Sequence, residues 1–137
     1  MSEFTLHPQL RTDSLRVGQM KLCELRLLND ERFHWCLLIP RISDLVELHD
    51  LPTAHRLTLF DEIEQVSQTL INYAASEKIN VAALGNKVQQ LHIHVIGRKT
   101  TDPSWPNSVW TAGPAEAYTK SGAETAIRSL REQLGIG

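Results

Sequence analysis

The sequence predicts a single α+β domain built around an antiparallel sheet. Two pairs of short apolar runs are each joined by a short polar turn, and such pairs favour β-hairpins. An amphipathic helical pattern of about six turns separates the two pairs, and a second helical pattern follows them. The order of elements is therefore strand, strand, helix, strand, strand, helix, and an antiparallel sheet of this kind can leave one face open.

The size and charge of the chain limit the partners that it can have. Its 137 residues suit one domain, residues 1–137, because a chain of this length can bury about two thirds of its unfolded surface. The net charge of −2 gives no basic field that would attract nucleic acid. The first residues carry no secretory-signal pattern, and no run approaches the roughly 20 apolar residues that span a bilayer. We therefore expect a cytoplasmic protein with no nucleic-acid and no membrane partner.

The first pair of strands covers residues 20–28 and 33–39. The earlier run alternates in part, whereas the later run is apolar and aromatic and ends at Pro40. The polar residues 29–32 form the turn between them. We expect residues 1–13 to be a loose lead-in with at most a short helical turn.

The spacing of apolar residues indicates two helices. The first helix begins at residues 50–53, and its core stripe recurs at intervals of four and three residues. This stripe consists of Leu59, Ile63, Val66, Leu70 and Tyr73. We expect Leu57 and Phe60 to widen it. The second helix covers residues 123–134, and an ordered loop at residues 100–114 precedes it.

The second pair of strands, at residues 79–84 and 88–98, carries the most informative pattern. In the later run, Gln90, His92 and His94 fall on one face of the expected strand. The opposite face carries Leu91, Ile93 and Val95. Because a strand holds alternate side chains rigidly side by side, the two imidazoles can face a phosphate or a metal together. On the residues alone, a semi-buried histidine pair without a chemical role stays open.

The segment Gln90-Leu91-His92-Ile93-His94-Val95-Ile96 resembles the signature of the histidine triad (HIT) family, in which three histidines alternate with apolar residues. The turn at Gly85-Asn86, the strand end at Leu28-Asn29-Asp30 and the strand at residues 36–41 are also similar to the family's, so the resemblance covers most of the chain. Residues 102–106, with Trp110 after them, resemble the tail of a proteobacterial subgroup of HIT-type hydrolases. The resemblance implies a half-barrel with an antiparallel sheet of about five strands, one long helix and a C-terminal helix, paired into a homodimer.

The resemblance also implies a nucleotide hydrolase that acts at the α-phosphate of a dinucleoside polyphosphate or a nucleoside phosphoramidate. His92 matches the central histidine, which attacks phosphorus and becomes a nucleotidyl-histidine, and imidazole suits that role near neutral pH. His94 matches the histidine that contacts the phosphoryl oxygens and the bridging atom. Asn29 and Asp30 match the ribose-binding position, and Asn86 is a further hydrogen-bond donor for the nucleotide. The family implies a small-molecule nucleotide as partner and no metal or other cofactor.

Two positions depart from the family pattern. Gln90 stands where the first histidine of the triad is expected, and it can exchange hydrogen bonds with phosphate but cannot be protonated near pH 7. Trp35 stands where many members carry a further histidine, and the neighbouring His34 points to the other face of its strand. We expect Arg98 either to touch phosphate or to be solvated. The tryptophans of the C-terminal loop either cover the substrate or pack the tail onto the body.

Three other functions stay open at this point. The protein could be a degenerate family member that binds a nucleotide without catalysis, with Gln90 marking the loss. It could transfer the nucleotide to a second substrate instead of to water. It could also hold a metal through His92 and His94, although no further ligand stands at a suitable spacing in the sequence.

Overall fold

The computed structural model describes residues 3–137 and contains a five-stranded antiparallel sheet with the order β1-β2-β3-β5-β4. The strands are β1 (Ser14–Gln19), β2 (Cys23–Leu28), β3 (His34–Pro40), β4 (Lys78–Ala82) and β5 (Ile93–Arg98). The helices are α1 (Pro8–Asp13), α2 (Thr53–Ala74) and α3 (Lys120–Leu134), with short 3-10 turns η1 (Leu48–Asp50) and η2 (Val109–Thr111). These elements confirm the α+β class, the sheet of about five strands, the long helix and the C-terminal helix.

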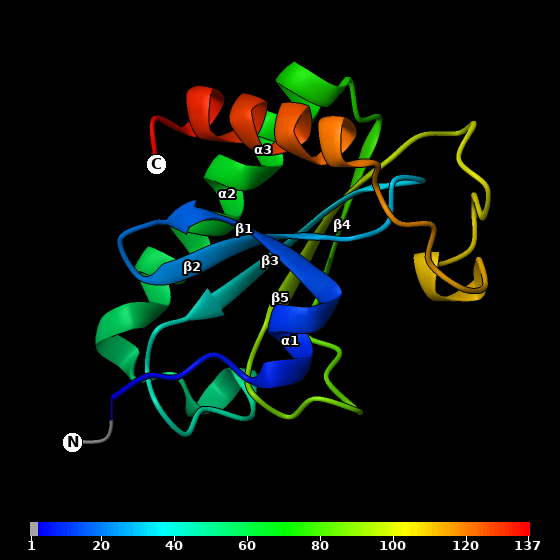
Figure 1. Cartoon of the computed structure of the whole chain (residues 1–137). Coiled ribbons are helices and arrows are strands. Elements are labelled where there is room, and N and C mark those ends of the chain that lie inside the picture. The colour runs from blue at the N-terminus through cyan, green and yellow to red at the C-terminus, as the bar shows by residue number, and fades with distance from the viewer. Residues whose placement is uncertain (1–2) are drawn as a thin grey trace.

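The two faces of the sheet are covered differently. Helices α2 and α3 lie together over one face (Figure 1), where strand residues pack against Leu59 and Val66 of α2 and Leu130 of α3. The other face carries a smaller apolar cluster, to which α1 contributes Leu10 and η2 contributes Val109. Leu10 of α1 and Trp110 of η2 also line one cavity on this face, which is part of the candidate site.

Both predicted hairpin pairings are present, because β2 pairs with β3 and β4 pairs with β5, all antiparallel. The last strand is shorter than expected. It begins at Ile93, and residues 83–92 form a loop, so the prediction of a strand over residues 88–92 is wrong. The backbone N–H of Leu91 donates to the carbonyl of Leu45 at 2.9 Å, which takes this residue out of the sheet ladder. Gln90 and His92 therefore lie on the loop that leads into β5.

The first strand was not predicted, since residues 14–19 had no assigned structure. A bulge between Arg16 and Gly18 shifts the pairing of β1 with β2, and this interrupts the alternation that marks a strand in a sequence. Residues 20–22, expected as the start of a strand, form the turn from β1 into β2.

A buried carboxylate from α2 holds this turn. Glu62 is 1% exposed, and its two oxygens accept hydrogen bonds from the backbone N–H groups of Leu22 at 2.7 Å and Cys23 at 2.9 Å. The carboxylate thus satisfies two buried backbone donors that the sheet ladder does not use.

Replacement of Glu62 is expected to destabilise the fold. Glu62→Ala should lower the free energy of unfolding by about 2–3 kcal/mol, because two buried N–H groups lose their acceptor. Glu64→Ala removes an exposed carboxylate from the same helix and should change this free energy by no more than about 0.5 kcal/mol. Urea unfolding of both variants checks the prediction, and equal losses in the two variants would contradict it.

The core stripe of α2 is confirmed at Leu59, Val66 and Leu70, which are buried, and Ile63 packs against them. Tyr73 is 37% exposed, so its place in the core stripe is not confirmed. The prediction that Leu57 and Phe60 widen the stripe is wrong, because these side chains are 73% and 66% exposed. At about 100° of rotation per residue, both positions lie well away from the line that joins the buried residues. Within residues 3–137, no helix combines the length and the apolar content that a membrane crossing requires.

Candidate active site

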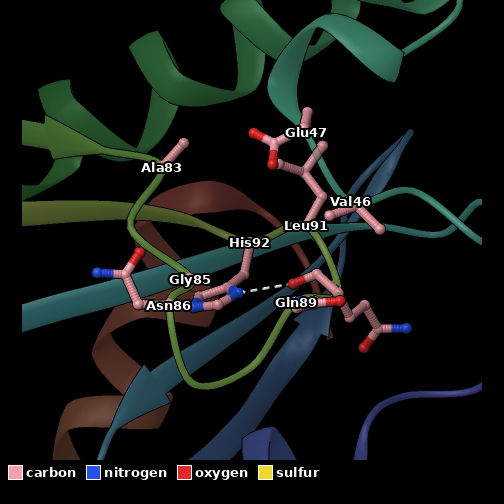
Figure 2. Close-up of a pocket in the computed structure, with 9 residues that line it drawn as sticks. Val46, Glu47, Ala83, Gly85, Asn86, Gln89, Leu91 and His92 are labelled. Atoms are coloured by element: carbon pink, nitrogen blue, oxygen red, sulfur yellow. Dashed lines mark hydrogen bonds between the residues drawn. The ribbon is translucent and has the colours of Figure 1, made fainter.

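His92 lies at the end of the loop before β5, and one hydrogen bond fixes its ring. Its Nδ1 lies 2.7 Å from the carbonyl oxygen of Gln90 (dashed line in Figure 2). A carbonyl can only accept, so Nδ1 carries the proton and the neutral ring has its lone pair on Nε2. Gly85 lies against this ring, since a Cβ there would come within 3.2 Å of His92 Cε1 and 2.6 Å of the Val88 carbonyl oxygen. The loop therefore needs glycine at this position mainly because a Cβ would clash with the Val88 carbonyl, and the imidazole of His92 packs tightly against the same point.

Two cavities meet at His92. The first has a volume of about 300 Å³, and its lining includes the polar side chains of Asn86 and Gln89 (Figure 2). The second has a volume of about 370 Å³ and a mainly apolar and aromatic lining, which includes Leu10, Leu28, Trp35, Leu37, Leu84 and Trp110. Gly85, Asn86 and His92 line both cavities. The imidazole of His92 is therefore shared between a polar and an aromatic compartment.

His94 faces the same side from β5, and both of its ring nitrogens are engaged. The indole Nε1–H of Trp35 donates to Nδ1 at 2.9 Å, and Nε2 donates to the carbonyl of Leu84 at 3.0 Å. Because an indole only donates and a carbonyl only accepts, these contacts define a neutral ring with its proton on Nε2. Burial lowers the pKa of His94 to about 4, and burial also lowers the pKa of His92. Both imidazoles are therefore uncharged at neutral pH.

The depressed pKa of His94 predicts a loss of stability in mild acid. An unfolded chain takes a proton on this imidazole near pH 6.5, whereas the folded protein does so only near pH 4. The contribution is therefore fully present above pH 6.5 and declines as the pH falls toward 4, by up to about 3 kcal/mol. Guanidine unfolding between pH 4.5 and 7 measures this slope. The His94→Asn variant should show a shallower slope, and an unchanged slope would contradict the assignment.

The two tryptophans of the C-terminal loop have different surroundings. The ring centre of Trp110 lies 4.9 Å from that of His94 and 5.5 Å from that of Trp35, both in edge-to-face contact. Trp110 is 41% exposed and lines the aromatic cavity. Trp105 instead packs against the guanidinium of Arg98, 5.6 Å from its ring centre. Of the two roles left open for these tryptophans, Trp110 lies where it can cover a substrate, and Trp105 packs the tail.

Comparison with known proteins places this geometry in a family. The model of the HIT domain matches residues 9–101. The chain belongs to the HIT family. A histidine triad protein from Sinorhizobium meliloti is 38% identical, with a TM-score of 0.92 and with 95% of this chain and 96% of that chain covered. A histidine triad protein from Marinobacter aquaeolei is 36% identical, with a TM-score of 0.94 and 98% of each chain covered.

A third HIT structure, from Bradyrhizobium japonicum, is 35% identical, with a TM-score of 0.93 and with 97% of this chain and 99% of that chain covered. None of the curated proteins compared with the chain matches it. The likeness to these three solved structures extends over almost the whole of the described chain, including the C-terminal loop and α3 that follow the matched HIT domain.

In this HIT protein, the side chain of Gln90 binds the N-terminal segment. Its Oε1 accepts a hydrogen bond from the backbone N–H of His7 at 2.8 Å, and its Nε2 donates to the carbonyl of Thr5 at 2.9 Å. Gln90 also lines the polar cavity. Its amide therefore ties residues 5–7 to the loop before β5, and a contact with phosphate stays a prediction.

The two residues expected at the ribose of a HIT substrate have different surroundings. Asn29 lines a third cavity of about 490 Å³ beside Trp110, and its Oδ1 accepts from the backbone N–H of Tyr118 at 2.9 Å. Asp30 is 2% exposed, and its two oxygens accept from the guanidinium of Arg32 at 2.9 and 2.8 Å. A ribose contact from Asp30 would have to break this ion pair, so Asn29 is the better placed of the two.

Arg98 follows neither of its two expected roles. It is 1% exposed, and it donates to Asp102 at 2.7 and 3.0 Å, to Asn80 Oδ1 at 2.9 Å and to the Asn107 carbonyl at 2.8 Å. These partners come from β4 and from the loop after β5, which the fold brings together around the guanidinium. Arg98 therefore anchors the loop that carries Trp110.

Two contacts of the site were not predicted from the sequence. The available signal for Trp35 was its alignment with a histidine of the HIT family, which suggested a place near the site but no hydrogen bond. The Leu84 carbonyl gives no sequence signal, because any residue type would supply the same acceptor.

Proposed function

We propose that the protein is a nucleotide hydrolase that acts at the α-phosphate of a dinucleoside polyphosphate or a nucleoside phosphoramidate, with His92 as the nucleophile. The observation that carries this proposal is the fixed tautomer of His92. The Gln90 carbonyl holds the Nδ1 proton, which leaves the Nε2 lone pair on a ring shared by a polar and an aromatic cavity. HIT membership supports the proposal, because HIT proteins are often nucleotide hydrolases or transferases.

In the proposed reaction, the nucleoside occupies the aromatic side of the site, where Trp110 offers a stacking face and Asn29 offers a polar group to the ribose. The phosphates lie near Asn86. Nε2 of His92 attacks the α-phosphorus as the bond to the leaving group breaks, and the Gln90 carbonyl stabilises the positive charge that develops on the ring. Water then attacks phosphorus, releases the mononucleotide and returns the electron pair to Nε2.

The alternatives make different predictions. A binding module without catalysis would take up a nucleotide and release no mononucleotide. A nucleotidyltransferase would pass the nucleotide to an added acceptor faster than to water. A metal centre has less support, because within residues 3–137 His, Cys, Asp and Glu side chains form no group of three that could hold a metal ion. In addition, the Trp35 indole occupies the lone pair of His94.

The proposed function is tested by hydrolysis of a diadenosine polyphosphate in ¹⁸O-labelled water. Attack at the α-phosphorus places the label in the adenosine monophosphate that is released. We expect one labelled oxygen in that product and none in the remaining polyphosphate. Label in the other product, or no release of monophosphate, would contradict the proposal. Unchanged activity in the presence of a chelator would separate it from the metal alternative.

We also propose that two copies pair through β4. This strand lies at the edge of the sheet, and Val81 within it and Leu84 shortly after it are 50% and 41% exposed. An exposed edge strand carries unpaired backbone donors and acceptors that favour pairing with a second chain. A cytoplasmic location stays a prediction from the sequence.

The homodimer is expected to dissociate when a charge is placed on this edge. Val81→Asp should shift the mass measured by light scattering after size exclusion from that of a dimer to that of a monomer, because pairing would bury the carboxylate. Ser121→Asp, at an exposed position of α3, should leave the mass unchanged. A monomeric wild-type protein at micromolar concentration would contradict the proposal.

A further inference from the structure

The contact between Trp35 and His94 limits what His94 can do for a reaction. Both side chains are 5% exposed, and the indole N–H points at the Nδ1 lone pair from 2.9 Å. If Nδ1 of His94 were protonated, its N–H and the indole N–H of Trp35 would point at each other with no water between them, and neither would have an acceptor. The remaining nitrogen already donates its proton to the Leu84 carbonyl. His94 is therefore held as a neutral ring that has no spare proton to give.

The two other members of the motif cannot supply that proton either. On His92, the Nδ1 proton is bound by the Gln90 carbonyl, and Nε2 is the atom that attacks phosphorus under the proposed function. The Gln90 side chain is an amide, which does not titrate, and it is bound to the backbone of Thr5 and His7. The motif thus offers no general acid to a substrate.

We propose that Trp35 sets the leaving-group specificity of the site, by holding His94 neutral so that only groups which depart as stable anions are displaced. This inference rests on the proposed function and narrows its substrate class to nucleotide anhydrides, in which the α-phosphate is joined through oxygen to a phosphate or a carboxylate. Trp35 acts through His94 and is a positioning residue.

The fate of the electron pair in the bond-breaking step explains this restriction. As the bond from His92 Nε2 to phosphorus forms, the bond from phosphorus to the leaving atom breaks, and its electron pair stays on that atom. A phosphate or carboxylate oxygen carries the resulting charge without a proton. An alkylamine cannot leave as an anion, so the nitrogen of a phosphoramidate must take up a proton as the bond breaks. General acid catalysis contributes about 10²–10⁴-fold to such steps, and the motif does not provide it.

A leaving-group series on the wild-type protein tests the inference without any mutation. The substrates are a diadenosine polyphosphate, an acyl adenylate, adenosine 5′-phosphate esters of phenols of graded acidity, and the phosphoramidate of adenosine 5′-phosphate with an alkylamine. We expect kcat/KM to fall steeply as the phenol becomes more basic, and to be about 10²–10⁴-fold lower for the phosphoramidate than for the anhydrides. A flat series, or a phosphoramidate cleaved as fast as the anhydrides, would overturn the inference and leave the proposed function intact. Release of no monophosphate from any substrate would instead overturn the proposed function, and the inference with it.

The role of Trp35 itself is tested by the ratio of phosphoramidate to anhydride turnover. Trp35→Phe keeps an aromatic ring but removes the N–H donor, so Nδ1 of His94 becomes free to take a proton, and we expect this ratio to rise about tenfold or more. Thermal unfolding shows whether the variant is folded, and the ratio is independent of the fraction that is active. Glu47→Gln and Lys87→Gln change ionisable side chains that line the cavities and should leave the ratio unchanged. A constant ratio in Trp35→Phe, or a changed ratio in either control, would assign leaving-group choice to another group and overturn the inference.

Discussion

Replacing His92 with alanine is expected to lower kcat for nucleotide hydrolysis by about 10⁴-fold or more, because the substitution removes the only atom proposed to bond to phosphorus. The loss should appear in kcat more than in KM, since the cavities that bind the nucleotide keep the rest of their lining. Steady-state release of adenosine monophosphate from a diadenosine polyphosphate measures both constants. Because His92 is buried, thermal unfolding of the variant should be measured beside its activity to show that it is folded.

A matched control variant shows whether the loss of activity is specific to the imidazole of His92 or follows the removal of any histidine. His34 lies on β3, and its ring packs 6.4 Å from the ring of Tyr73 on the helix-covered side of the sheet. His34→Asn should therefore keep kcat within about twofold of wild type. If His92→Ala retained more than a tenth of the wild-type rate, or if His34→Asn lost as much, His92 would not be the nucleophile.

The second large effect is on stability. Arg98→Met is expected to lower the free energy of unfolding by about 3–5 kcal/mol, because Asp102 keeps a buried charge after its partner is removed. Hydrogen bonds from Arg98 are the main reason that the pKa of Asp102 is lowered, so the charged form of this carboxylate loses its main stabilisation when Arg98 is removed. For a domain of this size, the thermal midpoint should fall by about 10 °C or more.

A double substitution identifies the unpaired charge as the cause. In Arg98→Met with Asp102→Asn, no buried charge is left alone, and the loss should be smaller than the sum of the two single losses by at least about 1 kcal/mol. Arg128→Met replaces an exposed arginine of α3 and should change the free energy of unfolding by no more than about 0.5 kcal/mol. Strictly additive losses, or a loss below about 1 kcal/mol for Arg98→Met, would contradict this role.

Much of the fold was predictable because the periodic signals are local. The alternation around His94 correctly placed Ile93 and Val95 against the helices and His94 on the opposite face. The helical stripe likewise identified the buried side of α2 through Leu59 and Val66. These patterns depend only on the sequence within one element, so they can be recognised without knowledge of the rest of the molecule.

The errors arose where distant residues decide the structure. Arg98 reads as an exposed strand end in the sequence, but the fold surrounds it with Asp102, Asn80 and the Asn107 carbonyl. The partners of Gln90 were not predicted either, because two backbone groups of the distant N-terminal segment bind its amide, while its contact with phosphate stays a prediction. These contacts span between 4 and 85 positions of sequence, and the residue types alone do not specify them.

In the candidate site, too, the local pattern was predictable from the sequence and the contacts with other segments were not. The motif identified His92 and His94 as neighbours, and their ring centres lie 4.9 Å apart. The tautomer of each ring depends on partners that no local pattern indicates, the Gln90 carbonyl for His92 and the Trp35 indole for His94. The structure therefore adds to the sequence the assignment of which nitrogen carries each proton.

The most direct test of the account is the mass of the intact protein after a rapid quench with a diadenosine polyphosphate. If Nε2 of His92 attacks phosphorus, a species heavier by one adenosine monophosphate unit should form within the first turnover, and peptide mapping should locate the adduct on His92. The adduct should be missing in His92→Ala and present in His34→Asn. Rapid hydrolysis with no adduct at any quench time, or an adduct on another residue, would contradict the assignment of His92 as the nucleophile.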